Sequence, residues 1–198
     1  MRAGRMTSER LIALTDGVIA VIITIMVLEM HAPAGAAFAD LKHVWPVFLS
    51  YVLSFVYLAI YWNNHHHFYR LTPHVTGLIM WANLHVLFWL SLIPFATAWA
   101  GDHPLSAAPT ATYGFVLLAC AAAWSTMQRV IAVAQGEDSP LRRALGRDLK
   151  GKISLVLYLA GIGLAFVEPW MSYLLYAAVA AVWIIPDKRV EASLEREE

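Results

Sequence analysis

The chain has 198 residues, of which 60% are hydrophobic and only 14% are charged, with no net formal charge at pH 7. Soluble domains average about 45–50% apolar and about 25% charged residues, so this composition excludes a disordered chain and a nucleic-acid binder with a basic surface. The single cysteine, Cys120, excludes a disulfide framework or a cysteine metal cluster within one chain.

Long apolar stretches divide the sequence. Five stretches contain no Asp, Glu, Lys or Arg: 43–69, 71–101, 103–128, 153–167 and 169–186. A sixth, 11–30, contains only Asp16 and Glu29, and it exceeds the ~7–15 apolar residues of a cleavable signal peptide. A bilayer core ~30 Å thick needs roughly 17–25 such residues in a helix. We therefore predict an all-α polytopic membrane protein with transmembrane helices at about 11–31, 44–63, 76–99, 110–135, 152–167 and 170–186.

The basic residues give this topology an orientation. With six spans, thirteen of the 14 Lys and Arg residues fall on the side of both termini and only Lys42 falls on the other side. Lys and Arg accumulate in cytoplasmic loops, so we predict that both termini are cytoplasmic. Residues 1–190 form a single six-helix domain in this prediction, and residues 191–198 form a short polar tail.

One face of the first predicted helix has an unusual composition. At 100° per residue, a single stripe contains Gly17, Val21, Thr24 and Leu28, with Ile25 at its border. Around a symmetry axis, such a stripe forms an apolar constriction with one ring of hydroxyl groups; an ordinary helix–helix seam is the alternative interpretation. Glu29, at the outer end of this helix, either forms an acidic ring that concentrates cations or is a solvated carboxylate.

Ionisable residues within a membrane are costly and mark functional sites. Asp16 points sideways from the stripe, either as a tolerated interfacial carboxylate or as a partner of Arg10 or a histidine. Three adjacent histidines follow Trp62 in the second span, but neighbouring side chains on a helix diverge and cannot share one metal ion. We expect one of these histidines to hydrogen-bond to Asp16 or Thr15.

The third predicted span contains Asn83 and His85, which we expect to hydrogen-bond across helices, and Pro94, which we expect to kink the helix. The sequence has no nucleophile elbow, no glycine-rich phosphate loop and no two-histidine zinc motif, so we do not expect an enzyme. It also lacks the potassium-channel filter Thr-Val-Gly-Tyr-Gly.

Several blocks resemble the signature of the transmembrane protein 175 family. The first helix contains Arg10, Leu14-Thr15-Asp16-Gly17 and a final Val27-Leu28-Glu29, similar to the family's Arg, Phe-Ser-Asp-Gly and Val-Leu-Glu pattern. The second helix ends Trp62-Asn63-Asn64-His65-His66, and the third contains Trp81-Ala82-Asn83 and Leu92-Ile93-Pro94-Phe95. The departures are Leu14 for Phe, which removes an aromatic ring, and Val21, which is small for a constriction.

The resemblance implies a homotetrameric, potassium-permeable cation channel in a bacterial cytoplasmic membrane, without a cofactor and without the usual filter. By position, the constriction residues are Val21, Ile25 and Leu28, and Thr24 supplies the hydroxyl layer. The resemblance also implies a structural hydrogen-bond network behind the pore, with candidates Arg10, Thr15, Asp16, His65, His66 and Asn83. The alternatives are a secondary transporter that relays protons through Asp16 and a histidine, and a non-conducting membrane scaffold.

Overall fold

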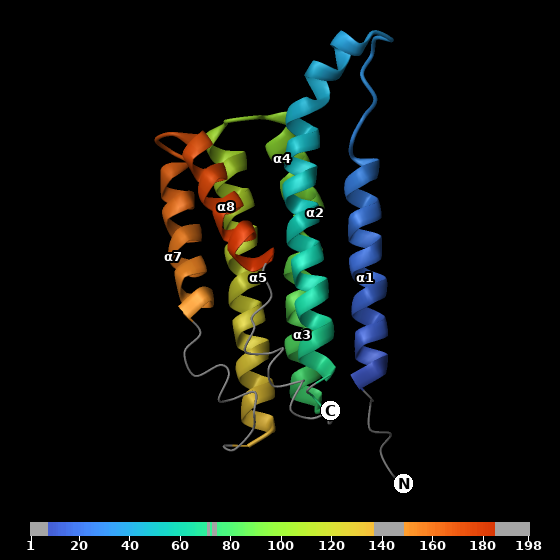
Figure 1. The fold of residues 1–198 in the computed structure, drawn as a ribbon, viewed down its shortest axis with the longest axis vertical. Helices are drawn as coiled ribbons and strands as arrows, with labels where there is room; N and C mark the ends of the chain where they lie inside the picture. Colours follow the sequence, from blue (N-terminus) through green and yellow to red (C-terminus); the bar gives the residue numbers. More distant parts are fainter. Residues whose placement is uncertain (1–7, 71, 73–74, 137–148, 185–198) are drawn as a thin grey trace.

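The described residues form an elongated helical bundle. The computed structural model describes residues 8–70, 72, 75–136 and 149–184. In chain order its elements are α1 (Ser8–Leu28), the 3-10 helix η1 (Phe38–Asp40), α2 (Leu41–Arg70), α3 (Gly77–Leu90), α4 (Ile93–Asp102), α5 (Ala107–Ala134), α7 (Leu149–Leu164) and α8 (Pro169–Ile184). Because α3 and α4 follow each other along one path (Figure 1), the bundle has the six helical segments of the predicted all-α fold.

The third predicted span, 76–99, is not one helix. α3 ends at Leu90 and α4 begins at Ile93, with Pro94 in the first turn of α4. Pro94 has no N–H to donate to the Leu90 carbonyl, and the chain turns more tightly here, with the Leu92 N–H donating to the Trp89 carbonyl at 3.2 Å. The kink expected at Pro94 is therefore a full break between two helices.

The helices differ in length from the predicted spans. Four segments are long and apolar enough to cross a membrane: Ser8–Leu28, Phe38–Tyr69, Gly77–Asp102 and Ala107–Ala134. α7 and α8 each contain 16 residues within the described part of the chain, or about 24 Å at 1.5 Å per residue, less than a full bilayer core. The end of the last predicted span and the tail 191–198 lie outside the described residues.

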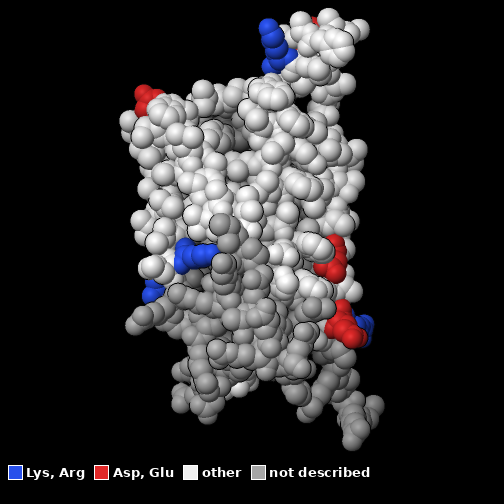
Figure 2. Space-filling view, in the orientation of Figure 1, with Lys and Arg blue, Asp and Glu red and all other residues white. Residues whose placement is uncertain are grey.

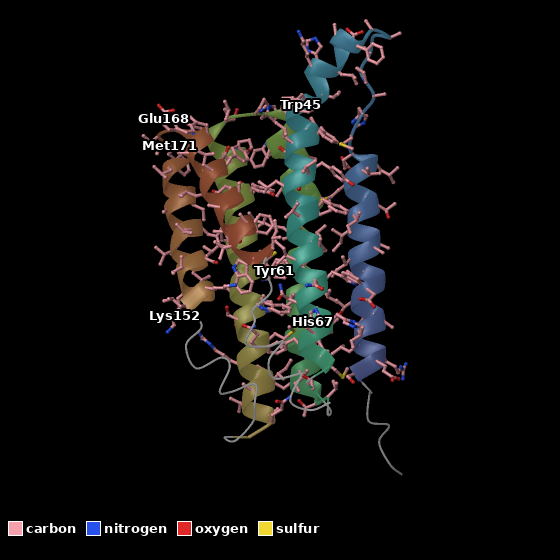
Figure 3. The ribbon with its side chains drawn as sticks, viewed as in Figure 1. Trp45, Tyr61, His67, Lys152, Glu168 and Met171 are labelled. Atoms are coloured by element: carbon pink, nitrogen blue, oxygen red, sulfur yellow. The ribbon has the colours of Figure 1, made fainter. Side chains whose placement is uncertain are left out.

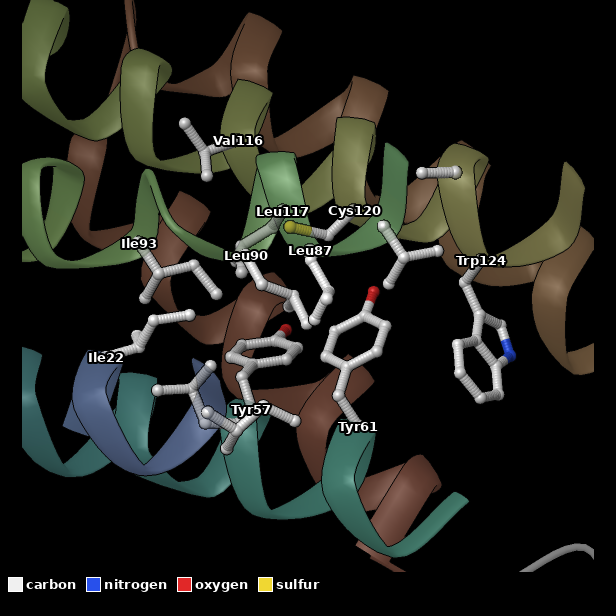
Figure 4. Close-up of a cluster of buried hydrophobic side chains, with 14 of the residues drawn as sticks. Ile22, Tyr57, Tyr61, Leu87, Leu90, Ile93, Val116, Leu117, Cys120 and Trp124 are labelled. Carbon is white, nitrogen blue, oxygen red and sulfur yellow. The ribbon is translucent and has the colours of Figure 1, made fainter. Parts of the chain in front are cut away.

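Packing places α1 at one edge of the bundle. α1 contacts α2, α3 and α4, whereas α5 packs between α3 and α4 on one side and α7 and α8 on the other. Figure 4 shows the core between these helices, where Ile22 of α1, Tyr57 of α2, Ile93 of α4 and Leu117 of α5 meet. η1 and the first turns of α2 project beyond the other helices (Figure 1).

The surface has the charge distribution of a membrane protein. Figure 2 shows a broad band without Lys, Arg, Asp or Glu below the end of the bundle that carries η1. Large apolar side chains are exposed on α3, α5, α7 and α8, among them Trp81, Phe115, Leu159 and Leu174. In water such a surface would be unfavourable, and in a bilayer it contacts lipid or other helices.

Candidate functional site

α1 has one buried and one exposed face. Its buried positions recur at helical spacing and contact the rest of the subunit: Leu11, Thr15, Ile19, Ile22 and Met26. The stripe predicted from the sequence lies on the exposed side, where Val21 is 57% exposed, Ile25 is 42% exposed and Leu28 is 72% exposed. α1 therefore presents an apolar face that its own subunit does not cover.

Thr24 lies on this exposed face. Its hydroxyl donates a hydrogen bond of 2.7 Å to the Ala20 carbonyl, one turn earlier in α1. A threonine hydroxyl has one proton and two acceptor lone pairs. Because the proton is used within the helix, the oxygen is left as an acceptor that can face a cation.

A groove of about 830 Å³ lies between the exposed side of α1 and the start of α4. Five of its lining residues come from the exposed side of α1 and the turn after it: Leu14, Gly17, Val21, Ile25 and Glu29. The opposite wall is formed by Ser91, Pro94, Phe95 and Ala98. The break before α4 thus shapes one wall of the groove, and the candidate constriction residues Val21 and Ile25 form the other.

Glu29 and His31 lie beyond the end of α1, which stops at Leu28 rather than at 31. The Glu29 backbone N–H still donates to the Ile25 carbonyl at 3.1 Å, and both side chains are exposed. The carboxylate of Glu29 therefore lies next to the C-terminus of α1, where the helix dipole has its negative end. The carboxylate of Glu29 and the negative end of the helix dipole both favour a cation at the C-terminus of α1.

Behind α1, three buried polar side chains connect three helices. The Asn83 Nδ2 on α3 donates to the Thr15 Oγ1 on α1 at 3.0 Å. The Asn83 Oδ1 lies 2.8 Å from His65 Nε2 on α2, and because the amide oxygen only accepts, His65 Nε2 is the donor. The exposed fractions of Thr15, His65 and Asn83 are 2% or less. A histidine thus reaches Thr15 through Asn83 and not directly.

Asp16 has a partner that the sequence did not predict. The Trp62 indole Nε1 on α2 donates to the Asp16 Oδ1 at 2.9 Å. Within the described residues, Asp16 makes no hydrogen bond or ion pair with Arg10 or with a histidine, so the predicted direct pairing is not present in this subunit. Arg10 and His66 form no hydrogen bond with the groups around Asn83 in the same part of the chain, and their membership of the network stays a prediction.

The spacing on α2 could have identified Trp62. Trp62, His65 and Tyr69 are separated by three and four residues, so they lie along one side of a helix. His65 and Tyr69 both reach Asn83, the latter through its hydroxyl at 3.5 Å. Trp62 also lies near the end of the predicted span 44–63, where tryptophans concentrate at the membrane boundary, so its position alone also fits an interfacial anchor.

The described part of the chain contains no group of three or more His, Cys, Asp or Glu side chains placed to hold a metal ion. His66 and His67 are neighbours with ring centroids 6.0 Å apart and planes at 78°. His67, labelled in Figure 3, lies toward the end of α2 that is remote from η1. The chemistry of the candidate site therefore belongs to the α1 face and to the hydrogen bonds behind it.

Long apolar helices, an uncharged surface band and an exposed apolar face on one helix together define a multi-pass helical membrane protein. Residues 10–94 match the model of the family described as endosomal/lysosomal potassium channel TMEM175. A potassium channel from Chryseobacterium sp. (strain P1-3) is 47% identical over 190 residues, covering 96% of this chain and 99% of the relative. The chain belongs to the TMEM175 family.

More distant relatives agree with this assignment. A potassium channel from Streptomyces collinus is 29% identical over 174 residues, which cover 81% of this chain and 84% of the relative. The crystal structure of a lysosomal potassium-selective channel TMEM175 homologue from Chamaesiphon minutus superposes with a TM-score of 0.79 at 24% identity. The match covers 89% of this chain and 96% of that one, and it supports the fold.

Proposed function

We propose that this chain forms a potassium-permeable cation channel in a bacterial cytoplasmic membrane, with α1 of each subunit lining the pore. The observation that carries the proposal is the exposed apolar stripe of α1, on a helix whose other side is buried in its own subunit. One relative named a potassium channel matches 96% of the chain, and two others match 81% and 82% of it. The family is one of ion channels and not an enzyme class.

One pore-lining helix per subunit requires several copies around an axis. We propose a homotetramer, in which the stripe residues form successive rings. Val21, Ile25 and Leu28 are the constriction, and Thr24 provides the hydroxyl layer between them. A narrow apolar ring opposes ion passage by excluding water, so the size of these side chains controls conduction.

The direction of α1 favours cations at the outer mouth. We propose that both termini are cytoplasmic, which places the C-terminus of α1 and Glu29 at the outer end of the pore. The negative end of each helix dipole and a ring of carboxylates then raise the local cation concentration. No cofactor is needed, because potassium itself is the permeant species.

Reconstitution of the purified protein in liposomes tests this function. We expect potassium flux that runs down its own gradient, exceeds sodium flux and needs no proton gradient. Native mass spectrometry in detergent is expected to give four copies per particle. Flux that requires a proton gradient would favour the transporter alternative, and a correctly folded tetramer without flux would favour a non-conducting scaffold.

A further inference from the structure

A second set of buried polar side chains joins α2, α4 and α5, apart from the groups around Asn83. Ser54 Oγ on α2 lies 2.7 Å from Thr97 Oγ1 on α4 and 2.8 Å from the Tyr113 hydroxyl on α5. Their exposed fractions are 0%, 4% and 1%. Buried hydroxyl groups without partners are costly, so each group depends on the next.

The directions of these hydrogen bonds follow from proton counting. Thr97 Oγ1 also lies 2.7 Å from the Ile93 carbonyl, to which it can only donate. Since each hydroxyl has one proton, Ser54 must then donate to Thr97, and Tyr113 must donate to Ser54. The result is a chain of hydrogen bonds, here called the relay, in which Tyr113 donates to Ser54, Ser54 to Thr97, and Thr97 to the Ile93 carbonyl of α4.

At Thr97, the relay contacts α1, the proposed pore helix. Thr97 Oγ1 lies 3.9 Å from the sulfur of Met26, which is buried on α1 and follows the candidate constriction residue Ile25. One turn earlier on α4, Ile93 points toward Ile22 of α1 (Figure 4). α4 thus contacts the buried side of α1 at Met26 and Ile22, behind the candidate constriction.

α4 depends on lateral contacts for its position. It is separated from α3 by the break at Ser91 and Leu92, so continuous helical hydrogen bonding does not hold it. At its far end it lies close to α2, because a Cβ at Gly101 would approach the Val47 Cα to 2.8 Å. Between that contact and the break, the Ser54–Thr97 hydrogen bond connects α4 to α2.

We propose that Ser54, Thr97 and Tyr113 are positioning residues that hold α4 against α1 and thereby set the width of the constriction at Ile25. This inference rests on the proposed function, since it takes α1 as the pore helix. Loss of the Thr97 hydroxyl leaves the Ser54 donor without its acceptor in an apolar core. The relay then no longer fixes α4, and α1 loses its lateral support at Met26.

The test compares Thr97→Val with Thr97→Ser and with Thr126→Val. Thr126 provides a matched control, because its hydroxyl donates to the Ala122 carbonyl at 2.8 Å on the exposed surface of α5. In liposomes, we expect Thr97→Val to change the ratio of potassium to sodium flux by about two- to thirtyfold, the range for substitutions in a coupling network. Thr97→Ser, which keeps the hydroxyl, and Thr126→Val are expected to match the parent protein.

A second measurement does not depend on ion flow. Spin labels on cysteines at Val21 and Phe95, which face each other across the groove, report the spacing of α1 and α4 through dipolar broadening in diluted, reconstituted protein. We expect Thr97→Val to change this spacing and Thr126→Val to leave it unchanged. If Thr97→Val leaves both the α1–α4 spacing and the flux ratio unchanged, the relay is overturned. If the parent protein has no potassium flux but Thr97→Val still changes the α1–α4 spacing, only the proposed function is overturned.

Discussion

The Trp62 indole N–H donates to the Asp16 carboxylate across the α1–α2 contact at 2.9 Å. A carboxyl group on α1 is thereby connected to α2 by a direct side-chain hydrogen bond. Hydrogen bonds to charged groups contribute about 1.5–3 kcal/mol. We therefore expect Asp16 to orient α1 against α2 rather than to act as an ion-binding ligand.

A double-mutant cycle measures this contact. We expect Asp16→Ala and Trp62→Phe each to lower the thermal stability of the assembled protein, with a coupling free energy of about 0.5–3 kcal/mol. Potassium dependence of flux in the surviving protein is expected to change little. Additive effects of the two substitutions, or a fully stable assembly of Asp16→Ala, would contradict the contact's role.

Truncation of the exposed stripe on α1 tests the constriction. We expect Ile25→Ala and Leu28→Ala to increase potassium leak in liposomes, because smaller side chains widen and hydrate an apolar ring. Leu159→Ala is the control, since Leu159 is also highly exposed but lies on α7. Unchanged leak in both α1 variants, at equal protein incorporation, would remove these residues from the constriction.

Asn83 connects α3 to both α1 and α2. Asn83→Leu removes the acceptor of His65 and the donor to Thr15, which leaves buried polar groups unpaired. We expect a loss of about 1–3 kcal/mol in unfolding free energy, measured by denaturation in detergent. Asn63→Leu, at a half-buried position on α2, should cost much less, and equal costs for the two variants would argue against a specific network.

Two glycines on α7 make a matched pair. A Cβ at Gly161 would lie 2.5 Å from the Tyr176 ring on α8, whereas a Cβ at Gly163 would meet nothing within 4 Å. Overpacking costs about 1–3 kcal/mol, so we expect Gly161→Ala to lower the melting temperature. Gly163→Ala is expected to be neutral or slightly stabilising, because alanine favours a helix. A reversed order would mean that α8 packs differently against α7.

Sequence patterns were sufficient for the number and helical character of the segments. Five charge-free runs and a sixth run with only two acidic residues predicted the six segments, because a bilayer core sets their minimum length and composition. Helical periodicity also placed Val21 and Leu28 on one stripe of α1 with Ile25 at its border, and all three side chains are exposed in the subunit; their role as a constriction stays a prediction. The break at Pro94 was predicted only as a kink, since the missing N–H could be identified but its effect on the chain path depends on packing.

Partners between distant residues required the tertiary structure. The sequence singles out Asp16 as an acidic residue within an apolar span, but it offered Arg10, a histidine or no partner at all. The choice of Trp62 depends on the rotation of α2 about its axis, which packing against α1 and α4 decides. The Ser54–Thr97–Tyr113 relay had no signal along the chain, because its members lie 43 and 59 residues from Ser54.

The low charge content of the chain thus determined the membrane environment and the helical class, because hydrophobic burial and backbone hydrogen bonding leave few options in a membrane. The helical spacing of residues in the first span determined the candidate pore stripe. Only the tertiary structure decided which polar groups pair, since a hydrogen bond needs two atoms within about 3 Å and sequence spacing does not fix distances between helices. The same limit applies to the groove between α1 and α4, whose walls come from segments about 70 residues apart.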